Sequence, residues 1–303
     1  MKKIYSITVI TSLLLIVSCS KDFLDVKPQQ SVLTEDVFKS MATTRAAVNG
    51  LYSLMQSYSY YGRDAMVIPE VLSDNATRSV RTGNRYTGMN TVTHTATDAN
   101  VSRMWSQMYQ IITNTNAIIA NEATIKKIAT SLEQEEAAQL VGEAYAVRAL
   151  VYFDLMKFFA RPLNFTADGS HLGVPLVIKP ITNITEVVYP ARNTAAEVYA
   201  QIDKDITAAI TLLPQTGNVI SNGVVNNTLF KIRMNRFSTL ALKARVSIYK
   251  SDWASAADAA NQVIASGRYA LYTFGNMLQD FRTQNSAESI FEIANNTNDN
   301  PGV

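Results

Sequence analysis

Residues 131–159 read SLEQEEAAQLVGEAYAVRALVYFDLMKFF, and this stretch decides the fold class. It opens with Ser131-Leu132-Glu133-Gln134, where a hydroxyl and an amide can cap the free backbone groups at the start of a helix. Pro162 follows and predicts where the helix ends. One set of residues recurs at three- and four-residue spacing, and we expect its members to be buried: Leu140, Val141, Ala144, Tyr145, Val151, Leu155 and Phe158.

Three polar side chains interrupt the apolar pattern of this helix: Arg148, Tyr152 and Asp154. A polar group inside a buried helix needs a hydrogen-bonding partner, so we predict that they join neighbouring helices instead of binding a ligand. The two tryptophans, Trp105 and Trp253, stand on apolar helical faces, where we expect core packing. A platform for a sugar ring is the alternative role for each tryptophan.

The same periodicity predicts helices before and after this stretch, and it is found in residues 48–55, 105–119, 194–213, 236–249 and 253–266. Thr194-Ala195-Ala196-Glu197 is a second capping pattern, and Pro214 follows the helix that it opens. Alternating strand patterns are almost absent. We therefore predict a mostly α fold with long loops between its helices.

The last two of these helices are separated only by a tight turn, which predicts a helical hairpin, and Gly267 is placed for a left-handed cap after it. Tyr249-x-x-Asp252-Trp253-x-x-Ala256 is similar to the turn of a tetratricopeptide unit. In such a unit an aromatic ring wedges between two helices and small residues let them approach. We expect an irregular helical scaffold with tetratricopeptide-like helix pairs.

Residues 73–100 show no periodicity and are rich in Asn, Thr, Gly, Arg and Tyr. A connection of about 28 residues is longer than most, so it is either functional or disordered. Neutral sugars are held by aromatic rings against C–H groups and by Arg, Asn and Asp side chains against hydroxyl groups. The loop offers these groups, and we predict that its ligand-binding residues are Asp74, Asn75, Arg78, Arg81, Asn84, Arg85 and Tyr86. A solvated loop whose arginines pair with nearby acids is the alternative.

The amino terminus has the pattern of an export signal. Lys2 and Lys3 precede an apolar run over residues 4–17, which is shorter than the about 20 residues of a membrane-spanning helix. The run ends at Ile16-Val17-Ser18-Cys19, which resembles a lipobox, and Cys19 is the only cysteine in 303 residues. We predict a lipoprotein signal peptide over 1–18, lipidation of Cys19, a lipid-anchored leader over 19–33 and a helical domain over 34–303. A plain secretory signal with an incidental cysteine is the alternative.

The charge balance argues against a nucleic-acid partner. Removing residues 1–18 takes away two lysines and no acid, which leaves 25 basic and 25 acidic side chains. A nucleic-acid-binding protein is expected to carry a basic excess that neutralises phosphates.

The sequence also lacks the usual patterns of a catalytic or metal site. His94 and His171 lie in polar loops, the only cysteine is predicted to carry lipid, and zinc-ligand spacings do not occur. Asp64, Glu70 and Asp74 could supply the carboxylate pair of a glycosidase, but solvated acids and helix caps are the commoner explanation. We predict no catalytic residues, no metal and no cofactor.

Taken in order, the segments of this chain resemble the SusD/RagB family of nutrient-binding outer-membrane lipoproteins of the Bacteroidetes. The segments that carry the resemblance are Cys19-Ser20-Lys21-Asp22-Phe23-Leu24-Asp25-Val26-Lys27-Pro28, Ala47-Val48-Asn49-Gly50-Leu51-Tyr52, Trp105-x3-Tyr109-x2-Ile112-x3-Asn116, Glu143-Ala144-x3-Arg148-Ala149-x2-Tyr152-Phe153-Asp154-Leu155, Gly173-Val174-Pro175-Leu176, Tyr199-x2-Ile202-x2-Asp205-Ile206, Ala241-Leu242-x-Ala244-Arg245-Val246-x-Ile248-Tyr249 and Glu288-Ser289-Ile290-Phe291-Glu292-Ile293. The last of these matches a strand-like piece of the family. Lys243 stands where the family usually has an apolar residue, and family members usually run well past residue 303, so we expect the C-terminal region of the family to be absent.

The resemblance implies a lipid-anchored helical scaffold at the surface of the outer membrane that binds oligosaccharides or other nutrients without catalysis. It also implies a SusC-like TonB-dependent transporter as partner, over which the protein docks and to which it delivers its ligand. The loop at 73–86 lies where relatives carry ligand contacts, although relatives often present Trp there.

A lipid-anchored tetratricopeptide-type scaffold that binds a peptide or protein partner in a helical groove is the alternative function. Convergence of Arg81, Asn84, Arg85 and Tyr86 on one exposed concavity beside an aromatic ring would favour the glycan-binding function. The structure can therefore discriminate between the two.

Replacing the predicted lipidation site tests the anchoring. Cys19→Ala is expected to abolish incorporation of labelled fatty acid and to release the protein from membranes, because a chain of balanced charge has no other strong attachment. Labelling and membrane fractionation measure both effects. Retention of the variant in the membrane fraction with its label intact would refute lipidation at Cys19.

Overall fold

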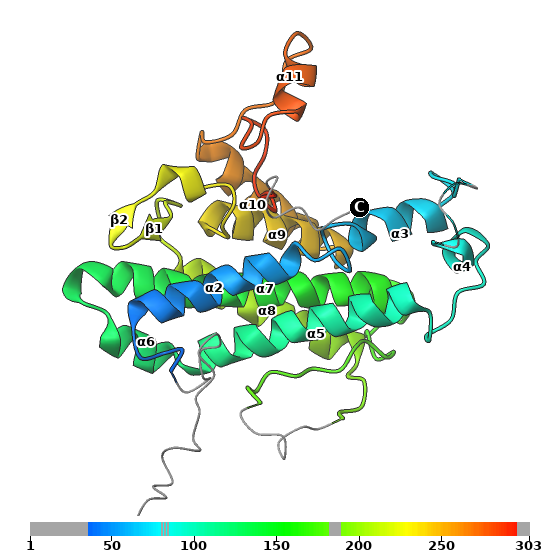
Figure 1. The fold of residues 1–303 in the computed structure, drawn as a ribbon, viewed down its shortest axis with the longest axis horizontal. Coiled ribbons are helices and arrows are strands. Elements are labelled where there is room, and N and C mark those ends of the chain that lie inside the picture. Colours follow the sequence, from blue (N-terminus) through cyan, green and yellow to red (C-terminus); the bar gives the residue numbers. More distant parts are fainter. Residues whose placement is uncertain (1–35, 80, 82, 84, 182–188, 296–303) are drawn as a thin grey trace, which may run out of the picture. The chain divides into compact units, whose positions relative to one another are not determined.

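Helix α7 (Gln134–Phe159) lies at the centre of the helical unit Phe38–Val303 (Figure 1). The computed structural model describes residues 36–295 apart from 80, 82, 84 and 182–188, so the predicted signal peptide, the leader and Cys19 lie outside the described residues. The elements around α7 are α2 (Met41–Met55), α3 (Asp64–Leu72), α4 (Thr87–Asn90), α5 (Ala99–Ala120), α6 (Glu122–Ile128), η3 (Ser131–Glu133), η4 (Leu163–Phe165), α8 (Ala195–Leu212), β1 (Ile220–Ser221), β2 (Val224–Val225), η6 (Asn227–Leu229), α9 (Arg236–Tyr249), α10 (Trp253–Ala265) and α11 (Met277–Phe281). The predicted mostly α fold is confirmed.

The residues that cap the start of α7 differ from the predicted ones. Thr130 and Glu133 cap each other's backbone, and the 3₁₀ turn that ends at Glu133 leads directly into the first α-helical residue, Gln134. Ser131 and Gln134 do not form the cap, so that prediction was wrong by one residue. The helix ends at Phe159, before Pro162, as predicted.

Almost every side chain of α7 between Glu136 and Met156 is buried, because helices pack on several of its sides. It contacts α2, α5, α6, α8 and α9. Tyr145 and Phe158, which we expected in the core, are half-buried at its margins. The other predicted apolar positions of this helix are buried.

Among the polar residues within α7, Arg148 joins neighbouring helices, as predicted, whereas Tyr152 and Asp154 bond segments that lie outside the helices. Arg148 forms a two-pronged ion pair with Asp205 of α8, at 2.8 Å from Nε to Oδ2 and 2.6 Å from Nη2 to Oδ1. Its Nη1 donates to Asn116 Oδ1 of α5 at 2.7 Å. Tyr152 donates its hydroxyl to the Val177 carbonyl at 2.9 Å and accepts the Val177 N–H at 2.8 Å.

The remaining polar residue of this set, Asp154, holds the segment that follows α2. Its Oδ2 accepts the hydroxyl groups of Tyr60 and Tyr61 at 2.5 and 2.6 Å, and its Oδ1 pairs with Lys157 at 2.7 Å. Asp154 and Tyr60 are both fully buried, so this contact fixes the turn between α2 and α3 onto the central helix.

The predicted helical hairpin is formed by α9 and α10. Leu240 of α9 packs against Ala259 and Val263 of α10, and Gly267 ends the pair in the left-handed region with φ of +64°. Core packing of Trp253 was a wrong prediction: it is the first residue of α10, at the turn, and its side chain is 65% exposed. Trp105 is half-buried between Tyr109 and Phe159, whose ring centroids lie 4.8 and 5.0 Å from its own.

A short antiparallel hairpin, β1 and β2, was not predicted. Its turn is Asn222-Gly223, with both residues at positive φ (+54° and +74°), and this dipeptide is a strong signal for a tight hairpin. The piece at 288–293, expected to be strand-like, has no strand partner among the described residues. Its Ser289 N–H donates to the nearby Ser286 carbonyl at 3.2 Å, and its Glu292 N–H donates to the Lys231 carbonyl at 2.8 Å. Within the described part of the chain, no helix combines the length and apolar character needed to cross a bilayer.

Removing the central ion pair tests this architecture. Arg148→Ala is expected to lower the free energy of unfolding by about 3–5 kcal/mol, because it leaves Asp205 buried without its counter-ion. Denaturant midpoints measure the change. The control is Arg103→Ala on the exposed side of α5, expected within about 0.5 kcal/mol of the parent; equal losses for both variants would contradict the role of the pair.

Candidate ligand-binding site

The predicted ligand-binding loop connects α3 to α5 and is less irregular than expected. It contains the short helix α4, and Asp98 caps the start of α5 by accepting the Asn100 N–H at 3.0 Å. Met89 of α4 is buried to 1% exposure and gives this part of the loop an apolar anchor. We call residues 73–90 the α3–α5 loop.

The first part of the loop is tied to α4. Asn90 Oδ1 accepts the Arg78 N–H at 2.9 Å and the Thr77 hydroxyl at 3.1 Å. The Arg78 guanidinium donates to the Gly83 carbonyl, which closes the tip of the loop upon itself. Arg78 is therefore half-buried and is part of the framework of the loop.

Four of the predicted site residues present exposed side chains: Asp74, Asn75, Arg81 and Arg85. Asp74 directly follows the end of α3 and has a positive φ of +61°, which a short polar side chain tolerates. Asn84 lies outside the described residues. The exposed part of the loop thus offers two guanidinium groups, a carboxylate and an amide to solvent.

Tyr86 points back toward the body of the protein. Its hydroxyl donates to Asp64 Oδ1 at 2.5 Å, and Arg63 Nε donates to the same oxygen at 2.9 Å. Arg63 also lies over two rings, with its guanidinium carbon 4.9 Å from the Tyr58 centroid and 5.7 Å from the Tyr86 centroid. Burial and the Asp64 carboxylate raise the pKa of Tyr86 to about 12, so its hydroxyl stays protonated and remains a donor.

The predicted convergence of Arg81, Arg85 and Tyr86 on a concavity is not seen among the described residues. None of the described site residues lines any of four open cavities of about 410–670 Å³ in the described part of the chain. The loop therefore presents its polar groups on a surface.

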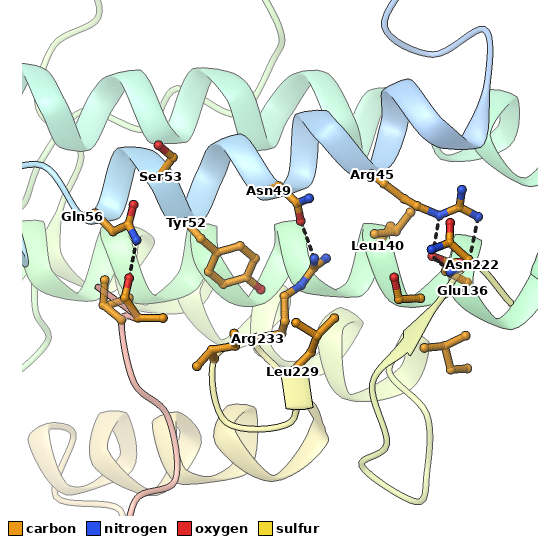
Figure 2. Close-up of a pocket in the computed structure, with 15 residues that line it drawn as sticks. Arg45, Asn49, Tyr52, Ser53, Gln56, Glu136, Leu140, Asn222, Leu229 and Arg233 are labelled. Atoms are coloured by element: carbon orange, nitrogen blue, oxygen red, sulfur yellow. Dashed lines mark hydrogen bonds and ion pairs between the residues drawn. The ribbon is translucent and has the colours of Figure 1, made fainter. Parts of the chain in front are cut away.

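A groove of about 510 Å³ with a mixed polar and apolar lining runs along α2 at a separate place (Figure 2). We call it the α2 groove; its lining includes Arg45, Asn49, Tyr52, Ser53 and Gln56 of α2, Glu136 and Leu140 of α7, Asn222 of the hairpin turn, and Arg233. The α2 residues recur at three- and four-residue spacing, so they form one face of the helix.

One end of the groove is built on Glu136, which is 1% exposed. It pairs with Arg45 Nε at 2.7 Å and accepts the backbone N–H groups of Asn222 and Gly223 at 3.0 and 2.9 Å. The buried carboxylate thus holds the hairpin turn, and the arginine neutralises its charge.

The middle of the groove is built on Glu143. Arg233 donates to its two oxygens at 2.7 and 3.1 Å, and the Tyr52 hydroxyl donates to Oε2 at 2.5 Å. Arg233 Nη1 donates to Asn49 Oδ1 at 2.5 Å, as Figure 2 shows. Burial, reinforced by the Glu143 charge, raises the pKa of Tyr52 well above its ordinary value. The groove is therefore lined by amides, hydroxyls and paired charges of both signs.

No group of three or more His, Cys, Asp or Glu side chains is placed to hold a metal ion within the described ranges. Asp64 is buried under Tyr86, whereas Asp74 is exposed on the loop, so these acids do not share an environment. His171 contacts the Thr166 hydroxyl through Nδ1 at 2.9 Å and the Arg161 carbonyl through Nε2 at 3.3 Å, and so closes the turn after α7.

Comparison with known proteins identifies the family. A SusD-like family model, described as "Starch-binding associating with outer membrane", matches residues 22–247. The chain belongs to the SusD-like family.

Relatives within this family include the SusD-like proteins P2 and P38 of Formosa agariphila. The first is 26% identical over 97% of this chain and 53% of its own length, and the second is 25% identical over 90% and 48%. The chain thus spans about half the length of the relatives it matches.

Solved structures of SusD superfamily proteins have the same fold. One from Bacteroides vulgatus is 29% identical, with a TM-score of 0.71 over 87% of this chain and 56% of that chain. One from Bacteroides thetaiotaomicron is 27% identical, with a TM-score of 0.70 over 83% of this chain and 52% of that chain.

The ionic lining of the SusD-like chain's α2 groove was not predicted from the sequence. The Asn222-Gly223 turn was a usable signal, because it predicts a hairpin with two outward-facing N–H groups. The pairing of Arg233 with Glu143 had no local signal, since 90 residues separate the partners.

Proposed function

We propose that this chain is a non-catalytic glycan-binding lipoprotein of the outer membrane that captures oligosaccharides at the cell surface. The observation that carries the proposal is the match of residues 22–247 to a family described as starch-binding and associating with the outer membrane. The export signal with its single cysteine supports the anchored location, because lipid would attach the mature chain at Cys19.

The exposed side chains of the α3–α5 loop support it as the ligand-binding surface. Sugar hydroxyl groups are bound by donors and acceptors whose positions are fixed in advance, since ordering them on binding costs free energy. The bonds of Asn90 and Arg78 within the loop fix its backbone, and Arg81 and Arg85 remain exposed between them. A neutral glycan also suits a mature chain of balanced charge.

A scaffold that binds a peptide or protein partner is the second candidate function. The α2 groove favours it, because this concavity lies between helices and contains none of the predicted sugar-binding residues. Its extent along three turns of α2 suits an extended chain. The groove and the loop are separate surfaces, so variants in each can distinguish the two functions.

Calorimetry of the detergent-solubilised full chain against a panel of oligosaccharides tests the glycan proposal. Arg81→Ala is expected to weaken binding by about 1–3 kcal/mol through lost hydrogen bonds, with the melting temperature unchanged. The affinity is expected to change little with salt, because a neutral ligand releases few counterions.

Two control variants complete this experiment. Arg282→Ala removes an equally exposed arginine just after α11 and is expected to leave glycan affinity unchanged. Ser53→Tyr narrows the α2 groove and is also expected to leave it unchanged. Loss of glycan binding in Ser53→Tyr but not in Arg81→Ala would move the site to the groove, and absence of binding to every glycan would favour the scaffold.

We further propose that the protein delivers its ligand to a SusC-like TonB-dependent transporter. Outer membranes solubilised gently are expected to yield a complex of this chain with a β-barrel of that class, identified by mass spectrometry. The Cys19→Ala variant, released from the membrane, is expected to yield less of the complex because anchoring raises the local concentration of both partners. Recovery of the chain without any such barrel would count against delivery.

A further inference from the structure

Asp64 is a buried carboxylate with few donors. The side chain is 1% exposed, at the first residue of α3, and its two hydrogen bonds, from Arg63 and Tyr86, both reach Oδ1. Among the described residues, Oδ2 has no partner. A buried carboxylate depends strongly on each donor that it retains, so the Tyr86 hydroxyl is a contact that the fold cannot easily replace.

Tyr86 adopts a backbone conformation that an aromatic residue rarely takes. Its φ of +57° and ψ of 18° lie in the left-handed region, at the start of α4. Such a conformation persists where surrounding contacts hold it. The bond to Asp64 and the packing of Arg63 against the Tyr86 ring are contacts of this kind.

The hydrogen bond between Tyr86 and Asp64 connects the end of the α3–α5 loop to the start of α3. Arg63 and Asp64 stand where α3 begins, before the loop, whereas Tyr86 stands near the end of the loop, 22 residues after Asp64. Asn90 ties the early loop residues Thr77 and Arg78 to α4, which Tyr86 precedes. Arg81 and Arg85 therefore lie on a segment that is attached on both sides.

We propose that Arg63, Asp64 and Tyr86 form a latch that holds the α3–α5 loop in its glycan-binding conformation, and that Tyr86 is a positioning residue for Arg81 and Arg85. This inference rests on the proposed function. It assigns the Tyr86 hydroxyl to the protein's own carboxylate, whereas direct contact with ligand was the role expected from sequence. A direct sugar contact would use the Tyr86 hydroxyl and ring, but the hydroxyl is already bonded to Asp64 at 2.5 Å and the ring lies beside Arg63.

Tyr86→Phe tests the latch, because it removes the hydroxyl and keeps the ring beside Arg63. Amide hydrogen exchange of residues 73–90 in the full chain is expected to accelerate about tenfold or more, while exchange in α5 and α7 stays unchanged. Affinity for the glycan found by calorimetry is expected to fall about five- to tenfold, because binding must then also order the loop. Tyr189→Phe, which removes a hydroxyl from a 95% exposed ring, is the matched control.

Asp64→Asn supplies the second variant. Asparagine keeps a carbonyl oxygen that can accept the Tyr86 hydroxyl, so exchange and affinity are expected between those of the parent and Tyr86→Phe. Unchanged loop exchange in Tyr86→Phe would overturn the latch. Reduced affinity without faster exchange would mean that the hydroxyl contacts the sugar, and faster exchange with full affinity would mean that the latch does not position the site.

Measuring hydrogen exchange as well as glycan affinity allows the latch and the proposed function to be tested separately. Hydrogen exchange reports loop order without any ligand, so it tests the latch even if no oligosaccharide binds. If no oligosaccharide binds, the glycan proposal fails, and so does the positioning role of Tyr86. Accelerated exchange in Tyr86→Phe would still establish that the bond between Tyr86 and Asp64 orders the loop.

Discussion

The fold depends on pairing the four buried charges of the central helix. Glu136, Glu143, Arg148 and Asp154 are each at most 4% exposed, and an isolated charge at such a position would be strongly unfavourable. Arg45 and the hairpin turn pair with Glu136, Tyr52 and Arg233 with Glu143, α5 and α8 with Arg148, and the turn after α2 together with Lys157 with Asp154. These polar partners therefore determine which segment packs at each position along α7. Apolar packing alone would not select the segments in this way.

These buried ion pairs determine which elements pack together more than they increase the net free energy of unfolding. Burying an ion pair costs desolvation energy that nearly offsets the attraction, but leaving one partner alone costs several kcal/mol. Arg148 fixes α5 and α8 together through Asn116 and Asp205, and Glu136 sets the hairpin turn against α2. The Glu136 contacts place one end of the α2 groove. Asp154 fixes the turn that precedes α3, and the α3–α5 loop follows α3. The central helix therefore also sets where the loop begins.

Local signals in the sequence predicted the six longest of the described helices but not the short helices α3, α4, α6 and α11, and distance along the chain explains most of the contacts that were missed. The periodic stripes, the Thr194 cap, Pro162 and Gly267 act within one or two turns, so their effect can be read from neighbouring residues. The Arg148–Asp205 pair spans 57 residues, and the Tyr86–Asp64 bond crosses a stretch with no periodicity. The composition of the loop suggested a ligand surface. It could not show that Tyr86 turns inward while Arg81 stays exposed, because that depends on where α3 begins in space.

The unlike surroundings of the two tryptophans give the protein two separate optical reporters. Trp253 meets solvent at the turn of the α9–α10 hairpin, whereas Trp105 packs edge-on to Phe159 and beside Tyr109, between α5 and the end of α7. An indole in water emits at longer wavelength than one in an apolar setting, so the emission band is a sum of two resolvable components. Replacing either ring by phenylalanine leaves a single-tryptophan protein. The protein that keeps Trp253 would report on the α9–α10 hairpin, and the one that keeps Trp105 would report on the central helices. The order in which these parts unfold could then be measured without an attached dye.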